Sequence, residues 1–316
     1  MNKNKVKRVL FGRRGNDGLI FKMFMYILLI GISFIYLYPL LRMLATSLMN
    51  LEDLIDSTKV WVPSTFQFSN FTKAMKTLNF WDSLFDSLKV SIYPTIIALV
   101  SSALIGYGFA TYDFPFKKLL MIILIASFLV PTIVTFRPNF VKFNEIQIKT
   151  GIKIIGTLKT YLFPAALGYG LRQTLFILIF YQFFKVIPKE LIEAAEVDGA
   201  SQLKIFIRIA IPMSLPAFLI CGLYSFVWYW NETSLATLYF GGNYTTLSMA
   251  VASFRSLYNQ LFPGGATVGN GAALESFNEG ILFAGTLLSI LPLLVIYFVC
   301  QRWFIEGVDK SGIAGN

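Results

Sequence analysis

Long apolar segments constrain this 316-residue chain more than any other feature of its sequence. A membrane-spanning helix needs about 20 consecutive, mostly apolar residues. Hydrophobic residues make up 56% of the chain and charged residues only 14%, which is typical of a membrane protein rather than of a soluble core. The sequence supplies six candidate spans: 20–47, 84–112, 119–140, 161–186, 209–231 and 280–304. We therefore predict an all-α membrane protein with six transmembrane helices.

The basic residues predict how these helices are oriented. The N-terminal tail, residues 1–19, is rich in lysine and arginine and has one acid, Asp17. Basic segments of this kind stay in the cytoplasm, and six crossings return the C-terminal tail, residues 305–316, to the same side. One region opposes this topology, because lysines outnumber acids in the predicted outer loop 141–160. The net charge of +10 indicates contact with membrane lipid headgroups and not with nucleic acid.

Three segments are expected on the outer side. Residues 48–83 are predicted to hold short helices that lie over the membrane, and 141–160 forms a second connection. Residues 232–279 contain glycine-rich pieces and are predicted to form an irregular outer cap, with a floppy loop as the alternative. Together with the six spans and the loop 187–208, these segments form a predicted six-helix permease domain that covers residues 20–304.

Small residues and prolines shape the predicted helices. Ser102, Gly106 and Ala110 recur at four-residue spacing, a pattern that lets membrane helices pack closely. Prolines fall inside several apolar segments, where neighbouring helices compensate for the freed backbone groups. The kinks are predicted at Pro39, Pro94, Pro131 and Pro292.

The chain lacks the motifs of common enzymes. It has no histidine, no P-loop motif, no G-x-S-x-G and no H-E-x-x-H, so no catalytic residue, metal site or bound cofactor is predicted. Its two cysteines, Cys221 and Cys300, lie in apolar segments and do not have metal-ligand spacing. The apolar segments also hold few of the carboxylates that ion-coupled carriers place at mid-membrane. Any transport is therefore expected to draw energy from another protein.

The charged loop 187–208 is the place where such a protein is expected to bind. Pro188 suits a first helical turn, and Asp198-Gly199 is a stop signal, because glycine adopts left-handed backbone angles without a Cβ clash. Ala194 and Ala195 leave a smooth patch that another surface can approach closely. We predict a helix, a turn and a second helix here.

This loop resembles the EAA loop of bacterial ABC importer permeases. The resemblance rests on Glu193-Ala194-Ala195, Asp198-Gly199-Ala200, Phe206, Ile209, Pro212 and Pro216. Other matching pieces resemble the carbohydrate-uptake branch and its maltose-type permease with six helices: Asp86-Ser87-Leu88, Gln182-Phe183-Phe184, Trp230-Asn231-Glu232, Gln301-Arg302 and the tail 312–316. Thr233, where the family often has an aromatic residue, and a longer outer cap depart from the pattern and leave the cargo open.

The resemblance implies a type I importer fold in the bacterial cytoplasmic membrane. Its partners would be a second homologous permease, a cytoplasmic ATPase dimer that holds ATP–Mg, and an extracytoplasmic solute-binding protein. The EAA helix would dock on the ATPase through Glu193, Ala194, Ala195, Asp198 and Gly199. Residues 307–316 are candidates to reach the ATPase dimer interface, with a frayed terminus as the alternative.

Aromatic and polar residues of the fourth and fifth spans are the candidates for a cargo path. Sugar rings stack on aromatic faces, and their hydroxyls seek amides, so Tyr224, Trp228, Trp230 and Asn231 suit a saccharide. An aromatic belt at the membrane interface, or a helix cap for Asn231, is the alternative. Arg172 is expected in the middle of the fourth span, facing an anionic sugar group, the partner permease or the outer surface.

We therefore expect a permease subunit for a carbohydrate, in particular an oligosaccharide. The alternatives are an ABC permease for a non-sugar solute and, from another class, an ion-coupled carrier or a membrane scaffold.

Overall fold

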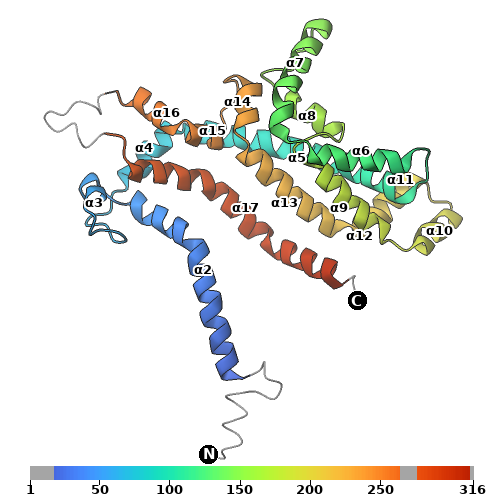
Figure 1. The fold of residues 1–316 in the computed structure, drawn as a ribbon, viewed down its shortest axis with the longest axis horizontal. Coiled ribbons are helices and arrows are strands. Elements are labelled where there is room, and N and C mark those ends of the chain that lie inside the picture. Colours follow the sequence, from blue (N-terminus) through green and yellow to red (C-terminus); the bar gives the residue numbers. More distant parts are fainter. Residues whose placement is uncertain (1–17, 264–275, 314–316) are drawn as a thin grey trace, which may run out of the picture. The chain divides into compact units, whose positions relative to one another are not determined.

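The computed structural model describes residues 18–263 and 276–313 (Figure 1). Within these residues all regular secondary structure is helical, and no strand is present. The predicted basic tail lies outside the described residues up to residue 17, and so do residues 264–275 of the predicted cap. The chain forms two compact units, which we treat separately: Met1–Ala74 with Phe262–Leu287, and Met75–Leu261 with Leu288–Asn316.

The first unit contains helix α2 (Leu19–Ser47), the short helix α3 (Leu51–Ile55) and most of α4 (Ser69–Thr77). The buried Asn70 side chain donates hydrogen bonds to the backbone carbonyls of Ser47 (3.0 Å) and Met49 (2.9 Å). This amide therefore fixes the start of α4 against the end of α2. The short helices predicted in the segment 48–83 are confirmed.

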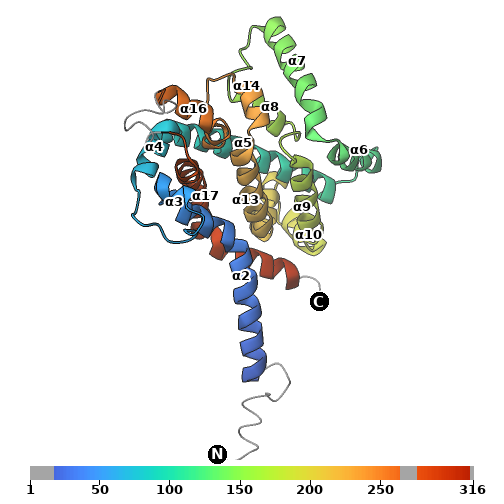
Figure 2. The same ribbon diagram turned by 60° about the vertical axis from the view of Figure 1, so that its left-hand side comes forward.

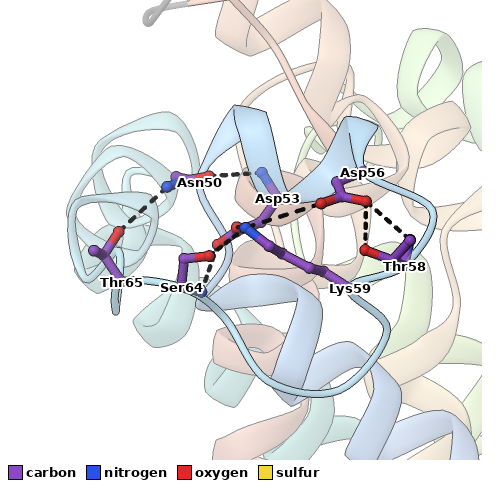
Figure 3. A network of polar contacts seen from close by, with 7 residues as sticks. All are labelled: Asn50, Asp53, Asp56, Thr58, Lys59, Ser64 and Thr65. Atoms are coloured by element: carbon purple, nitrogen blue, oxygen red, sulfur yellow. Dashed lines mark hydrogen bonds and ion pairs between the residues drawn. The ribbon is translucent and has the colours of Figure 1, made fainter.

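A polar network orders the loop that follows α3 (Figure 3). The carboxylate of Asp53, which is only 1% exposed, accepts hydrogen bonds from the Lys59 ammonium (2.8 Å) and from the Ser64 backbone N–H (2.9 Å). The hydrogen bond from Lys59 is the main cause that lowers the pKa of Asp53 to about 2. Lys59 also donates to the Ser64 hydroxyl. Asn50, which caps the start of α3, and three residues of the loop complete the network: Asp56, Thr58 and Thr65.

The second unit is built around α5 (Phe80–Thr111), against which α9 (Gln173–Lys185) and α13 (Leu215–Asn231) pack in both views (Figures 1 and 2). A Cβ atom at Gly106 of α5 would lie 2.8 Å from the Phe180 Cβ and 2.9 Å from the Tyr181 backbone nitrogen. The close helix packing predicted from the small residues is therefore confirmed at Gly106.

The predicted third span, 119–140, is two helices. Helix α6 (Lys117–Leu129) ends before Pro131, and α7 (Thr132–Thr150) begins after it. Proline lacks the N–H that a continuous helix would need at this position, and it suits a helix start instead. The prediction of a kinked helix at Pro131 and of a loop from 141 is corrected, because α7 occupies that loop up to residue 150.

The predicted fourth span, 161–186, is also broken. Helix α8 (Lys159–Ala166) and α9 are separated by residues 167–172, where Gly168 and Arg172 both adopt left-handed angles (φ 80° and 48°). By length and composition, the described residues contain three helices able to cross a membrane, or up to five if each bent helix pair counts as one span. The all-helical membrane fold is confirmed, and the count of six spans stays a prediction.

The predicted cap is largely helical over its described part. It contains α14 (Ser234–Phe240), α15 (Leu247–Ala252) and α16 (Phe254–Leu261). The Leu247 N–H donates to the buried Ser87 hydroxyl of α5 (2.8 Å), so these helices rest on the core helix. The expectation of an irregular cap is therefore corrected for these residues. Helix α17 (Glu279–Ile313) passes residue 304 without a break and continues into the predicted tail.

Candidate functional site

The charged loop of the second unit forms the predicted helix, turn and helix. Helix α10 (Lys189–Val197) ends at Asp198, Gly199 has φ 75°, and α11 (Gln202–Ile205) begins after Ser201. The Gly199 N–H donates to the Glu196 carbonyl (3.0 Å), and the Ala200 N–H donates to the Ala195 carbonyl (2.9 Å). These bonds satisfy the last carbonyls of α10 and require the left-handed residue that glycine supplies.

The outer surface of α10 is acidic and has no ionic partners within the described chain. Glu190, Glu193 and Asp198 are exposed, and none forms an ion pair with another described residue. Ala194 is also exposed, while Ala195 is half-buried. The arrangement leaves a short helix with exposed acidic side chains and an exposed alanine beside them.

Three aromatic rings connect this loop to the core helices. Phe206 begins the π-helix η1 (Phe206–Ala210), and its ring contacts Tyr107 of α5 (4.9 Å between centroids) and Phe184 of α9 (6.0 Å). Helix α12 (Ile211–Met213) follows, and the whole helical stretch Gln202–Met213 meets α13 at an angle of 76°. Phe206 therefore links the charged loop to α5 and α9 by direct contact, and η1 and α12 connect the loop along the chain to α13.

The break between α8 and α9 is held by one buried side chain. The Gln173 amide oxygen accepts a hydrogen bond from the Gly170 N–H (2.7 Å), and its NH₂ group donates to the Ser101 hydroxyl (2.6 Å) and the Ala165 carbonyl (2.9 Å). A Cβ at Gly170 would lie 2.8 Å from the Tyr229 hydroxyl, so only glycine fits there. These contacts keep the non-helical backbone of 167–172 in one shape.

A cavity of about 380 Å³ lies beside this break. That volume falls in the range of roughly 300–1,000 Å³ that ligand sites occupy. Its walls come from α6, α7, α8, the start of α9, α13, α14 and the break itself. Its polar lining residues are Ser127, Thr135, Asn139, Thr160, Tyr161, Tyr169, Arg172, Gln173, Thr174, Tyr229 and Tyr239. Tyr161, one of these lining residues, has a buried hydroxyl that finds no hydrogen-bond partner among the described residues. Burial raises the pKa of Tyr239 to about 12, which keeps its hydroxyl neutral.

Arg172 lines this cavity, but it does not lie in the middle of a helix. It immediately precedes α9 in a left-handed conformation, so the mid-span position predicted for it is wrong. Its guanidinium carbon Cζ lies 5.0 Å from the centroid of the Trp228 ring, a cation–π distance. Trp228 in turn stacks on Phe176 at 5.3 Å.

The four residues proposed from α13 are not gathered at the cavity. Trp230 is 2% exposed and packs against Phe226, Tyr224 is exposed, and Asn231 is the exposed last residue of the helix. Only Trp228 approaches the cavity, through Arg172. Their role in a cargo path stays a prediction.

Sequence reasoning missed the tyrosines that line the cavity, namely Tyr161, Tyr169, Tyr229 and Tyr239. A signal was present in Gly168-Tyr169-Gly170, because two glycines inside an apolar segment mark a break. No group of three metal-ligating side chains occurs among the described residues.

Apolar helices, a charged helical loop and a polar-lined cavity are the features of a membrane transport component. Figure 2 shows α10 at one end of the second unit, and α7 and α14 at the other. Residues 102–310 match the family described as binding-protein-dependent transport system inner membrane component. The chain belongs to this family.

Similar proteins cover nearly the whole chain. An osmoprotective-compound uptake permease of Synechocystis sp. is 28% identical over 92% of both chains. An arabinooligosaccharide transport system permease of Halalkalibacterium halodurans is 25% identical over 90% of this chain and 93% of the relative. A solved bacterial ABC transporter that imports the acidic polysaccharide alginate has the same fold, with a TM-score of 0.69 at 18% identity, over 92% of this chain and 98% of the other.

Proposed function

We propose that this chain is the permease subunit of an ATP-driven, binding-protein-dependent importer of a carbohydrate, in particular an oligosaccharide. The observation that carries the proposal is the connection from the exposed α10, across the Gly199 turn, to the Tyr107–Phe184–Phe206 ring cluster. Membership of the transport family and the arabinooligosaccharide permease among its relatives support this assignment.

Energy enters through α10. The helix docks in a groove of a separate cytoplasmic ATPase, where the exposed Glu193 meets a basic residue and Ala194 and Ala195 allow close approach. ATP–Mg is bound and hydrolysed on that partner, and this chain carries no catalytic residue. When the ATPase dimer closes, α10 moves as a rigid element, and Phe206 and η1 transmit the motion to the core helices. π-Helical turns are frequent at functional sites, and η1 is the segment that connects the charged loop with α12 and α13.

The cargo passes the cavity beside the break between α8 and α9. Its tyrosine rings offer faces for the C–H surfaces of a sugar, and the Tyr161 hydroxyl offers an unused hydrogen bond. Tyr224, Trp228 and Asn231 are candidates further along the path.

The other parts of the proposed assembly complete the path and the energy supply. A second homologous permease forms the other half of the path, and an extracytoplasmic binding protein delivers the cargo. Both termini face the cytoplasm of a bacterial cell, where the end of α17 and the tail after it are candidates to contact the ATPase dimer.

Uptake by purified components tests the proposal. The full complex is reconstituted in proteoliposomes with the binding protein, and entry of a labelled oligosaccharide is followed with and without ATP. We expect uptake to require both ATP and the ATPase subunit. We also expect uptake to continue when ionophores abolish the ion gradients. Uptake driven by an ion gradient without the ATPase would contradict the proposal and favour an ion-coupled carrier.

A further inference from the structure

The cavity beside the α8–α9 break carries positive charge that a neutral sugar would not need. Arg172 is among its lining residues, which include no aspartate or glutamate. Arg172 forms no ion pair with any residue in the described part of the chain. Glu232 is not among the lining residues, and its carboxylate accepts a hydrogen bond from the Leu235 N–H (2.9 Å) at the start of α14. The guanidinium thus remains available to an external anion.

Trp228 orients this guanidinium without neutralising it. Cζ of Arg172 lies 5.0 Å from the Trp228 ring centroid, and Trp228 is supported by Phe176. Stacking on a ring face leaves the N–H donors at the edge of the guanidinium plane free for a planar, bidentate acceptor such as a carboxylate. Arg172 also adopts a left-handed conformation (φ 48°) that is unfavourable for an arginine, and such residues cluster at functional sites.

Lysines of α7 extend the positive charge outward from the cavity. Thr135 and Asn139 of α7 line the cavity. Lys142 follows Thr135 by seven residues and Lys149 follows Lys142 by another seven, so both lysines lie near the same face of α7. Both lysines are exposed and form no ion pair within the described residues. Lysines on the outer side oppose the usual charge bias of membrane proteins. The exposed Glu145 lies between them, so this segment of α7 keeps a net positive charge. We infer that this charge attracts and guides an anionic cargo.

We propose that this cavity takes a saccharide that bears a carboxylate, such as a uronic acid unit. Its carboxylate pairs with the Arg172 guanidinium, a sugar hydroxyl meets the buried and otherwise unpartnered Tyr161 hydroxyl, and Lys142 and Lys149 attract it. This inference rests on the proposed carbohydrate transport and names the class of carbohydrate.

Binding to the intact complex tests the charge requirement without the selectivity of the binding protein. The chain with its partner permease and ATPase is placed in nanodiscs of zwitterionic lipid. Equilibrium dialysis then compares end-labelled tetragalacturonate with the same oligosaccharide after methyl esterification, which removes the charge and keeps the sugar. The variants are Arg172→Gln, Arg172→Lys and the double variant Lys142→Gln/Lys149→Gln. Lys118→Gln, an exposed lysine outside the cavity lining, is the charge-matched control.

We expect the wild-type complex to bind the uronate roughly ten- to a hundredfold more tightly than the ester, as for one charge-assisted pair. Arg172→Gln should remove this preference and leave ester binding within about twofold. Arg172→Lys should keep only part of the preference. It keeps the positive charge but loses the planar guanidinium, which binds a carboxylate through two hydrogen bonds. The double lysine variant should weaken uronate binding and its salt dependence, and Lys118→Gln should match the wild type.

Equal binding of uronate and ester by the wild type would overturn the proposal, and so would an undiminished preference in Arg172→Gln. A lipid headgroup is the other source of an anion. If Arg172→Gln changes only the amount of copurified phosphatidylglycerol and leaves uronate binding unchanged, the site holds lipid and the proposal is wrong. ATP-driven uptake of a neutral oligosaccharide by the same variants would show that the general transport function stands in either case.

Discussion

The ring centroid of Phe206, at the start of η1, lies 4.9 Å from that of Tyr107 in α5. Phe184 of α9 completes the cluster, 5.3 Å from Tyr107. Phe206 follows the α10–α11 loop directly, so the loop that faces the proposed ATPase is anchored between two core helices. Tightly packed side chains of this kind resist displacement relative to one another.

Phe206→Ala is expected to weaken this anchor. Phe206 is 8% exposed, and truncation of a buried phenylalanine lowers the free energy of unfolding by about 3–5 kcal/mol. We also expect fewer sugar molecules imported per ATP hydrolysed, because α10 would move without the core. Thermal unfolding and the uptake-to-hydrolysis ratio measure the two effects. Leu203→Ala, at a neighbouring side chain that is 65% exposed, is the control and should change stability by less than about 0.5 kcal/mol. Equal stability of the two variants would show that Phe206 is not an anchor.

Gly106→Ala is expected to destabilise the contact between α5 and α9. Its Cβ would meet the Phe180 Cβ at 2.8 Å and the backbone of Tyr181 at 2.9 Å, and overpacking of this kind costs about 1–3 kcal/mol. Gly108→Ala, two residues away in the same helix, would meet nothing within 4 Å and should be neutral or stabilising. Thermal unfolding of both variants in detergent makes the comparison. A smaller loss at Gly106 than at Gly108 would contradict the close packing described here.

Gln173→Ala is expected to loosen the break between α8 and α9. The substitution leaves the Gly170 N–H without its acceptor and removes three contacts of the amide NH₂ group, and each unsatisfied buried group costs about 1–3 kcal/mol. Faster hydrogen exchange at residues 167–172 and a lower melting temperature should follow. Gln182→Ala, at an exposed position of the same helix, should leave both unchanged. Unaltered exchange in the Gln173 variant would mean that the break does not depend on this side chain.

The network around Asp53 is expected to depend on pH. Its pKa of about 2, against a usual value of 3.8, means that the folded loop favours the ionised carboxylate. The resulting stabilisation is fully present above pH 3.8 and is lost as the pH falls through about 2. Hydrogen exchange at the Ser64 amide, which donates to Asp53, should accelerate over this interval. Asp53→Asn should show fast exchange already at neutral pH. An amide as protected in that variant as in the wild type would refute the role of the carboxylate.

The sequence predicted the elements whose signals are local. The α10 helix and its Gly199 turn follow from a proline start and a glycine stop, and the close approach at Gly106 follows from small residues at helical spacing. These features depend on backbone conformation and side-chain size, which a single segment specifies.

The cavity could not be predicted in the same way, because its walls come from segments that are distant in the sequence. Arg172 was expected inside a helix, since the apolar run from 161 to 186 has the length of a span. The Gln173 bonds to Ser101 and Ala165 offset the interrupted helix, and these partners are known only once α5 and α8 are in place. The cap was expected to be irregular for a related reason, because its short helices are supported by contacts such as that of Leu247 with Ser87.

Coupling through α10 is the central claim, and uptake by a double variant tests it most directly. Glu193→Ala/Gly199→Ala removes the proposed ionic contact and strains the turn, at about 1–2 kcal/mol for a non-glycine residue in the left-handed region. Glu145→Ala/Gly151→Ala is the matched control, since Gly151 ends α7 with φ 72° and, as at Gly199, an added Cβ atom would meet nothing within 4 Å. In proteoliposomes with the binding protein, we expect the first variant to lose ATP-driven uptake and the control to keep it. Uptake by the Glu193/Gly199 variant within about twofold of the wild type would contradict the account.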